Sequence, residues 1–310
     1  MTVERIPITD REQWLGLRRR DVTASAAAAL LGVHPYQTPY GLAAEKLGWL
    51  SDQVAEKGAI LRGNRLEAVV INEIAIARPD WQLARGDAYF RDPDARLGGT
   101  PDTYATDAEG RAGTVQIKTV ADTIFARKWK QDGELVLPPW IAVQANVEAH
   151  LIGARWAAVG VMVVGHGWDL HIIDVPIHAG IIERVRSEVA AFWRMVDEGR
   201  LPDPDYARDG AAIARLYAES TAGARVDLSA DNELPEILAR REILKASVKA
   251  AGEELEAIDA QIRAKLGEAE VASLPGWLIT AKTQHRKEYV VKAGTTRPLR
   301  IKNLNEEIAP

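Results

Sequence analysis

The stretch "GGTPDTYATDAEGRAGTVQIKT", residues 98–119, decides the fold. Two runs with β character flank "TDAEGRAG", a loop rich in Gly and Asp, and this pattern predicts a strand hairpin. Asp102 would lie at the end of the first strand, with Gln116 and Lys118 on the second. Because side chains alternate along a strand, Gln116 and Lys118 would share one face and Ile117 would point into the core.

The residue types in this hairpin suit metal-dependent hydrolysis of a phosphodiester. Carboxylates hold Mg²⁺, and a lysine can orient the nucleophile or stabilise a charged transition state. Gln116 stands where a second carboxylate is expected, and its amide oxygen can ligate Mg²⁺ but brings no charge. A surface hairpin whose polar residues face water explains the same spacing, so the hairpin alone does not decide the function.

Composition sets the outer bounds. With 310 residues, of which 47% are hydrophobic, the chain can form one large domain, or a domain with an appendage. The formal net charge of -5 gives no global attraction to nucleic acid or to anionic membranes, although a local patch can still bind phosphate. The absence of cysteine excludes disulfides, thiol catalysis and iron–sulfur clusters.

Nothing in the sequence predicts a membrane protein. The N-terminus lacks an apolar signal core, and the longest apolar run, residues 156–165, is too short to span a bilayer. We therefore expect a cytoplasmic location, in a bacterial or phage-infected cell.

Hydrophobic periodicity divides the chain into an α/β domain over residues 1–205, a linker over 206–230 and an extension over 231–310. Proline and aspartate crowd the boundary at "LPDPDYARDG". Within the first part, helices are predicted at 10–31 in two pieces, within 34–48, and at 58–77, 138–153 and 178–199, and strands within 81–120 and 155–177.

The extension has a different pattern. Apolar residues at steps of three and four predict a long amphipathic helix over 234–266, either half of a helical hairpin or a coiled-coil segment. It could dock a partner, form an oligomer or pack within the chain. The stretch 276–303 predicts two short strands and carries seven Lys or Arg residues against one acid, Glu288. These charges could follow a DNA path or solvate an edge strand.

An ordered series of motifs adds specificity. "LRRRDVTASAAAALLGVHPYQTP", "RGNRLE", "GGTPD", "VQIKT" and "VQAN…LIG" together resemble the YqaJ-like viral recombinase family. These are alkaline exonucleases related to that of phage lambda, within the PD-(D/E)xK nuclease superfamily. The resemblance covers roughly residues 10–200 and implies a restriction-endonuclease-like mixed β-sheet flanked by helices. The long helix and basic β tail look like an extension that some members carry.

The resemblance also implies an activity. Such a protein would be a 5′ to 3′ exonuclease on linear double-stranded DNA that leaves 3′ single-stranded overhangs. It would use Mg²⁺ or Mn²⁺, with two ions expected, and would form a homo-oligomeric ring, with a trimer favoured. It would act with a single-strand annealing protein in phage-type homologous recombination.

The resemblance assigns roles to residues that match the motifs. Asp102 matches the metal-binding aspartate, Lys118 the catalytic lysine and Glu67 the acid that helps to hold the second metal. Gln116 would be a neutral metal ligand in the place of the motif glutamate, and the Ile117 carbonyl would be a further ligand.

Further residues also match motifs of this family. Arg18 and Ser25 match a pocket for the 5′-terminal phosphate, where a guanidinium can grip the anion beside helix N–H groups. Gln144 matches the first glutamine of a Q-x-Q helix pattern, and Asn146 replaces the second. Trp14 falls in a helical pattern and is expected in the core.

Gln116 leaves the activity open. It could be natural in an enzyme that still cuts, mark a protein that binds ends but hydrolyses slowly, or be a deliberate substitution. The first alternative function is therefore a DNA-end-binding recombination factor with weak or no nuclease activity. A second, an iron–sulfur nuclease of the Cas4 type, is removed by the absence of cysteine. A third is an adaptor protein that functions through its long helix.

Overall fold

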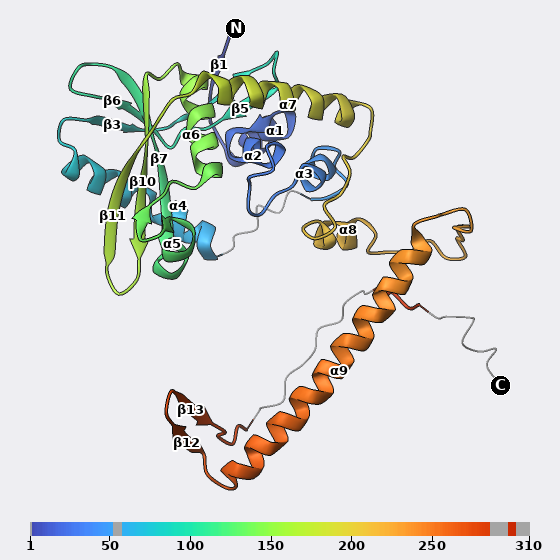
Figure 1. The fold of residues 1–310 in the computed structure, drawn as a ribbon. Coiled ribbons are helices and arrows are strands. Elements are labelled where there is room, and N and C mark those ends of the chain that lie inside the picture. The colour runs from blue at the N-terminus through green and yellow to red at the C-terminus, as the bar shows by residue number, and fades with distance from the viewer. Residues whose placement is uncertain (1, 52–57, 286–296, 302–310) are drawn as a thin grey trace. The chain divides into compact units, whose positions relative to one another are not determined.

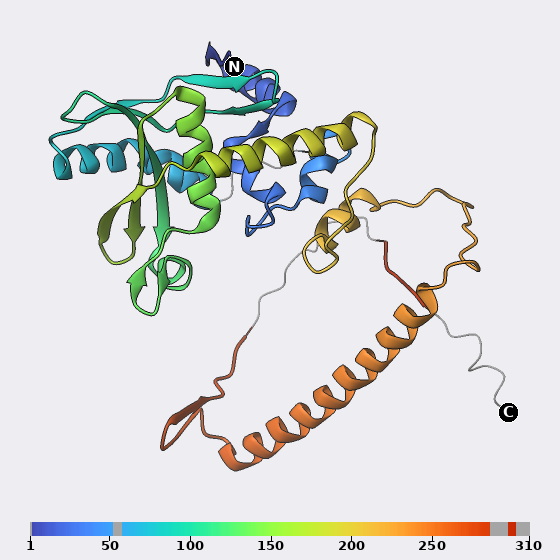
Figure 2. The same ribbon diagram turned by 45° about the horizontal axis from the view of Figure 1, so that its top comes forward.

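The computed structural model describes residues 2–51, 58–285 and 297–301. The chain divides into two compact units, Met1–Tyr217 and Ala218–Pro310. The first unit is a mixed α/β domain, and the second holds one long helix and a strand pair (Figures 1 and 2). The expected fold class, a mixed sheet flanked by helices with a helical and β appendage, is confirmed.

Most helices of the first unit fall where periodicity predicts them, although no helix was predicted at 122–128 or 210–216. They are α1 (Arg11–Arg20), α2 (Ala24–Leu30), α3 (Pro39–Lys46), α4 (Gly58–Ala77), α5 (Asp122–Lys128), α6 (Pro139–Ile152), α7 (Ala179–Asp197) and α8 (Gly210–Leu216). The strands are β1 (Glu4–Pro7), β2 (Val22–Thr23), β3 (Gln82–Arg85), β4 (Ala88–Asp92), β5 (Leu97–Gly99), β6 (Thr103–Thr106), β7 (Ala112–Ala121), β8 (Lys130–Gln131), β9 (Glu134–Leu135), β10 (Trp156–Val164) and β11 (Trp168–Val175).

The central sheet has five strands in the order β11-β10-β7-β6-β3. Strands β6 and β7 pair antiparallel with Ala105 opposite Gly113, so the hairpin predicted from residues 98–119 is confirmed. Strand β7 pairs parallel with β10 on its other side. Since parallel neighbours need a long crossover, α5 and α6 lie between these two strands in the sequence.

Helices cover both faces of this sheet (Figure 1). Val70 and Ile74 of α4 form one core with Val115 and Ile117 of β7. On the other face, Ala145 and other residues of α6 pack with β10 and α5. Ile117 therefore points into the core as predicted. By the alternation along a strand, Gln116 and Lys118 project from the face that α6 covers.

A second, smaller sheet has the order β1-β4-β5-β2. Residues of α2, α6 and α7 form the core beside it. The chain passes from this sheet to the central one between Gly99, the last residue of β5, and Thr103, the first of β6. Asp102 therefore lies at the junction of the two sheets.

The first unit includes helix α8, which falls in the segment expected to be a linker. Asp209, at the start of this helix, is buried. It accepts hydrogen bonds from the Thr38 hydroxyl and, at 2.8 Å, from the Asp205 amide. These contacts tie residues 205–209 to α3, because Thr38 is the N-cap of that helix.

The second unit contains α9 (Leu234–Leu266), which matches the predicted long helix. Its apolar side chains at Leu244, Val248, Leu255 and Ile258 are exposed. Packing of this face within the chain is therefore not seen among the residues that the structure describes.

One strand of the tail has a partner that periodicity missed. Strand β13 (Trp277–Thr280) pairs antiparallel with β12 (Val271–Leu274), which precedes Gly276, and Gly276 turns the chain with a φ of 81°. The expectation placed both strands after Gly276. Residues 286–296 and 302–310, with most of the basic charges of the tail, lie outside the described residues.

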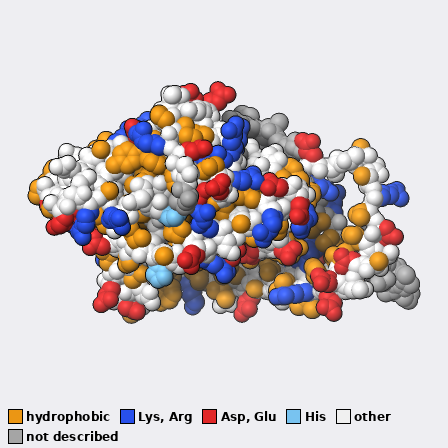
Figure 3. Space-filling model, turned by 90° about the horizontal axis from the view of Figure 1, so that it is seen from above, with side chains coloured by type: hydrophobic (Ala, Val, Ile, Leu, Met, Phe, Trp, Pro, Cys, Tyr) orange, Lys and Arg blue, Asp and Glu red, His pale blue; other side chains and the backbone are white. Residues whose placement is uncertain are grey.

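No helix in the described residues is long and apolar enough to cross a membrane. On the face shown in Figure 3, positive and negative side chains are interspersed. Any attraction to a polyanion must therefore come from local groups on this face, because the summed field of mixed charges is small.

Candidate functional site

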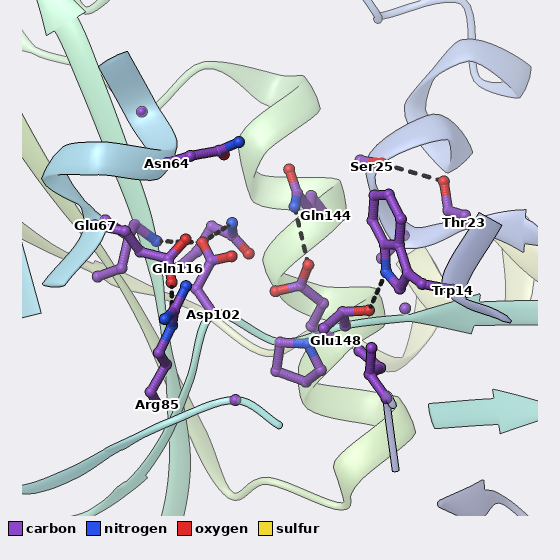
Figure 4. A pocket seen from close by; sticks show the side chains of 18 of the residues that line it. Trp14, Thr23, Ser25, Asn64, Glu67, Arg85, Asp102, Gln116, Gln144 and Glu148 are labelled. Atoms are coloured by element: carbon purple, nitrogen blue, oxygen red, sulfur yellow. Dashed lines mark hydrogen bonds and ion pairs between the residues drawn. The ribbon is translucent and has the colours of Figure 1, made fainter. Parts of the chain in front are cut away.

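A cavity of about 650 Å³ opens in the first unit, between the junction of the two sheets and helices α1, α4 and α6 (Figure 4). Polar side chains dominate its walls. Every side chain that the sequence analysis assigns to the site contributes to them. These residues are Arg18, Ser25, Glu67, Asp102, Gln116, Lys118 and Gln144, and the wall also includes Ile117.

Asp102 is held by the backbone around it. Its Oδ2 accepts a 2.8 Å hydrogen bond from the Ile117 amide and another from the Gln116 side-chain amide. Its own carbonyl accepts from the Gly86 amide at 2.9 Å. A Cβ on Gly86 would lie 1.9 Å from the Pro101 carbonyl oxygen, so only glycine fits there without moving the Pro101–Asp102 backbone.

The electrostatic balance at Asp102 is set mainly by burial. Loss of solvation raises the pKa of Asp102, and the charge of Lys118 and the Ile117 N–H bond oppose that rise. The Glu67 charge raises the pKa of Asp102 further, which shows that the two carboxylates are close enough to interact. A positive charge near Asp102 and Glu67 would therefore stabilise the charged forms of both.

Gln116 occupies the expected place, and its amide is oriented by Asp102. The side chain is 1% exposed, and its Nε2 donates to Asp102. The opposite orientation would place two acceptor oxygens against each other, so the Nε2 must face Asp102. This leaves Gln116 Oε1 buried with no hydrogen-bond partner.

Glu67 lies on the cavity wall but is not free. Arg85 Nε donates to its Oε1 at 2.7 Å, and Arg85 is itself a lining residue from the end of β3. The sequence analysis missed Arg85. An arginine at the end of a short, mostly exposed strand gives no signal that separates it from a solvated side chain.

Glu148 of α6 is the largest omission from the sequence analysis. It lines the cavity and is 1% exposed. Its Oε1 accepts from Gln144 Nε2 at 2.9 Å, while its Oε2 has no hydrogen-bond partner. Burial, and after it the Asp102 charge, raise the pKa of Glu148 to about 8. The site therefore holds a third carboxyl group, contributed by a helix.

This pKa predicts a pH-dependent stability. Because the folded pKa lies above the ordinary value of 4.5, the native state binds more protons between about pH 4.5 and 8. The stability due to protonated Glu148 is present below pH 4.5 and is lost as pH rises through 8. We expect Glu148→Gln to be more stable than wild type, by a margin that grows by roughly 2 to 3 kcal/mol between pH 5.5 and 8.5.

Urea unfolding in EDTA at these two pH values measures the margin. The control is Glu183→Gln, which removes an exposed glutamate from α7. A margin for Glu148→Gln that stays constant with pH would contradict the raised pKa.

The far end of the cavity is formed by α1 and the start of α2. Arg18 stacks on Trp14 with its guanidinium carbon 4.5 Å from the ring centroid, and Trp14 Nε1 donates to Thr100 Oγ1 at 3.1 Å. The Ser25 and Thr23 hydroxyls are 3.1 Å apart. Figure 4 shows Trp14, Thr23 and Ser25 on the side opposite Glu67. The expectation that Trp14 lies in the core was wrong, since it lines the cavity.

Asn146, which replaces the second glutamine of the family's helix pattern, makes hydrogen bonds within the packed interior. It is 1% exposed, and its Oδ1 accepts from the His178 amide at 2.8 Å. Its Nδ2 donates to the Ala142 and Pro176 carbonyls. These bonds join α6 to the segment before α7, and Asn146 is not among the residues that line the cavity.

The donors in the cavity fit a divalent cation in part. No three Asp, Glu or His side chains are gathered as a ready-made cage among the described residues. Two carboxylates, Asp102 and Glu148, do interact across the cavity, and the Glu148 Oε2 and Gln116 Oε1 atoms lack partners. Oxygen donors of this kind are the ligands that Mg²⁺ prefers.

Comparison with known proteins places the domain. Residues 13–153 match the model of the YqaJ-like viral recombinase domain, which includes every site residue from Trp14 to Glu148. Residues 13–153 are thus similar to this family's domain, and the resemblance drawn from the motifs is confirmed. The protein YqaJ of Bacillus subtilis is 22% identical over 267 residues, which cover 84% of this chain and 79% of YqaJ.

Two of the solved structures that this chain resembles are described as exonucleases. An alkaline exonuclease from Laribacter hongkongensis is 18% identical, with a TM-score of 0.46 and coverage of 66% of this chain and 99% of that one. A phage-related exonuclease from Haemophilus somnus is 14% identical, with a TM-score of 0.42 and coverage of 57% and 94%. At these scores the likeness carries no argument about substrate or chemistry.

Proposed function

We propose that this protein is a metal-dependent 5′ to 3′ exonuclease that acts on linear double-stranded DNA and leaves 3′ single-stranded overhangs. The observation that carries the proposal is the cavity itself. Carboxylates and Lys118 lie at one end, and Arg18 with two hydroxyl groups lies at the other. A cavity with both ends polar in this way can hold a terminal phosphate and a scissile phosphodiester at once.

At the carboxylate end, the chain would supply ligands for metal ions and one positively charged side chain. Asp102 and Gln116 would hold Mg²⁺ or Mn²⁺, Glu67 would help to hold a second ion, and the Ile117 carbonyl would be a further ligand. When bound, these ions would supply Lewis acidity and shield the negative charge of the phosphodiester. Lys118 would orient the nucleophile and stabilise the extra negative charge of the transition state.

At the other end, Arg18 and Ser25 would bind the 5′-terminal phosphate. A guanidinium presents parallel N–H donors that match phosphate oxygens, and the Trp14 ring fixes its plane. The neighbouring arginines Arg19 and Arg20 are exposed and do not line the cavity. Of the three arginines of the run, only Arg18 is among the lining residues, which supports its assignment to the phosphate site.

The decisive experiment is digestion of a linear duplex labelled separately at its 5′ and 3′ ends. We expect early release of the 5′ label, a requirement for Mg²⁺ or Mn²⁺, and no cutting of closed circular DNA. Release of the 3′ label first would overturn the proposed direction. If the labelled duplex stays intact at every metal concentration, the proposed activity is wrong.

The phosphate site makes a separate prediction. Arg18→Ala should lower the ratio of digestion rates on 5′-phosphate and 5′-hydroxyl ends by roughly tenfold or more, because a hydrogen-bonded charged partner is worth about 1.5 to 3 kcal/mol. Steady-state rates on the two ends give the ratio. Arg19→Ala, on the same helix but exposed, is the control and should leave the ratio unchanged.

A second candidate function is an end-binding recombination factor that hydrolyses DNA slowly. It is favoured by one observation: Gln116, which fills the place of the motif glutamate, is neutral and donates to Asp102. Binding of duplex ends without cleavage, together with strong cleavage by Gln116→Glu, would support this function over the nuclease.

The remaining expectations concern assembly. A closed ring, with a trimer favoured, would keep the enzyme on its substrate, and a single-strand annealing protein would receive the overhang. A cytoplasmic location follows if the substrate is phage or bacterial DNA. Sedimentation with and without duplex DNA tests the ring, and deletion of residues 231–310 tests whether the extension serves oligomerisation or the partner.

A further inference from the structure

Glu148 lacks partners that the buried acids Asp21, Asp92 and Asp209 have. Asp209 accepts hydrogen bonds on both of its carboxylate oxygens, from Thr38 and from Asp205. Asp21 and Asp92 are equally inaccessible to solvent, but each has an arginine partner, Arg91 at 3.0 Å and Arg186 respectively. Glu148 has only the Gln144 amide on one oxygen. Burial of a carboxylate without a cation is costly, so the fold retains Glu148 in a state that a positive charge would stabilise.

The side chain is directed into the cavity that contains Asp102 (Figure 4). The two carboxylates repel each other, while Lys118 attracts both. Arg85, another cation of the cavity wall, is engaged with Glu67. Two carboxyl groups thus share one lysine, and a further positive charge between them would favour the ionised forms of both.

Gln116 gives a second indication that a cation binds here. Its Oε1, like the Glu148 Oε2, is buried without a hydrogen-bond partner, and both residues line the same cavity. Both atoms are acceptors, so neither can satisfy the other. A divalent cation is a ligand that both oxygens can share, and it also offsets the charge of Glu148.

We propose that Glu148 is a ligand of the divalent cation, and that helix α6 thereby supplies the carboxylate that strand β7 lacks at Gln116. The inference rests on the proposed metal-dependent function and assigns a further residue to that site. Glutamate and glutamine have nearly the same volume, so the pair can exchange places without repacking the cavity. The negative charge of the site is then conserved, although it comes from a different element.

Direct titration of the metal-free protein with Mn²⁺, followed by the EPR signal of the free ion, tests the proposal without relying on cleavage. Four proteins are compared: the wild type, Glu148→Gln, the double exchange Gln116→Glu with Glu148→Gln, and Glu183→Gln. We expect Glu148→Gln to weaken Mn²⁺ binding by at least about tenfold, since loss even of a group that only supports a ligand costs that much. The double exchange should restore binding, and Glu183→Gln should match wild type.

Two results with the variants would overturn the proposal. One is Mn²⁺ binding by Glu148→Gln that equals wild type, and the other is a double exchange that fails to regain affinity. Circular dichroism spectra and urea unfolding of the same samples establish that each variant is folded. A wild type that binds no Mn²⁺ also overturns it.

Cleavage assays on the same samples separate this inference from the proposed function. If wild type binds Mn²⁺ through Glu148 but digests no duplex, the ligand assignment stands and the nuclease function fails. If wild type digests the duplex and Glu148→Gln binds Mn²⁺ normally, the nuclease function stands and the ligand assignment fails.

Discussion

Replacement of Asp102 by asparagine should reduce the rate of duplex digestion by about a thousandfold or more, equivalent to roughly 4 kcal/mol of transition-state stabilisation. Asp102 is the acid that interacts with both of the others, Glu67 and Glu148. Asparagine keeps the size and can still accept from the Ile117 amide, so the fold is expected to persist. The loss would come from the missing charge. Single-turnover digestion of a 5′-phosphorylated duplex measures it.

Glu109→Gln provides the matched control for this change. Glu109 lies in the loop of the same hairpin, is exposed and pairs with Arg111. The Glu109→Gln variant should digest the duplex at the wild-type rate. A rate for Asp102→Asn within a few-fold of that control would remove Asp102 from the catalytic centre.

Lys118→Met should lower the single-turnover rate by about a hundredfold to a thousandfold, the range seen when one positioned donor is removed from a developing negative charge. Methionine keeps an unbranched side chain of similar length, so packing on the α6 face of β7 changes little. DNA-end binding should weaken far less than the rate, because Lys118 is expected to act on the transition state and not on the bound end.

The control for this variant is Lys130→Met, which removes an exposed lysine from β8. Its rate and its affinity for duplex ends should both match wild type. Equal losses of rate and affinity in Lys118→Met would show that the lysine serves binding and has no special role in the chemical step.

The hairpin was predictable because strand alternation is a strict geometric rule. The order of polar and apolar residues from Gln116 to Lys118 was sufficient to place Ile117 in the core and the other two side chains on the opposite face. The helices were predictable for the same reason, since proline and glycine mark both ends of α6. Both are local features that depend on neighbours in the sequence.

Glu148 was not predictable in this way. Helix α6 packs against the central sheet on one side and against the second core on the other, so apolar residues surround it and periodicity does not mark a cavity-facing side. The available signal was a glutamate in a mostly apolar helix, four residues after Gln144. Trp14 was misplaced for a related reason, because a tryptophan on a helical stripe has the same pattern whether it faces a core or a cavity.

The junction between the two sheets also has a consequence for the reaction products. Residues 100–102 link the smaller sheet to the central one, with Thr100 bonded to Trp14 and Asp102 directly before β6, so this link fixes the distance between the two ends of the cavity. If the 5′-terminal phosphate is anchored at one end of the cavity and the scissile phosphodiester is cut at the other, this distance determines the length of the product. We therefore expect a constant product length whatever the base sequence, and one added residue in this link should change that length or abolish cutting.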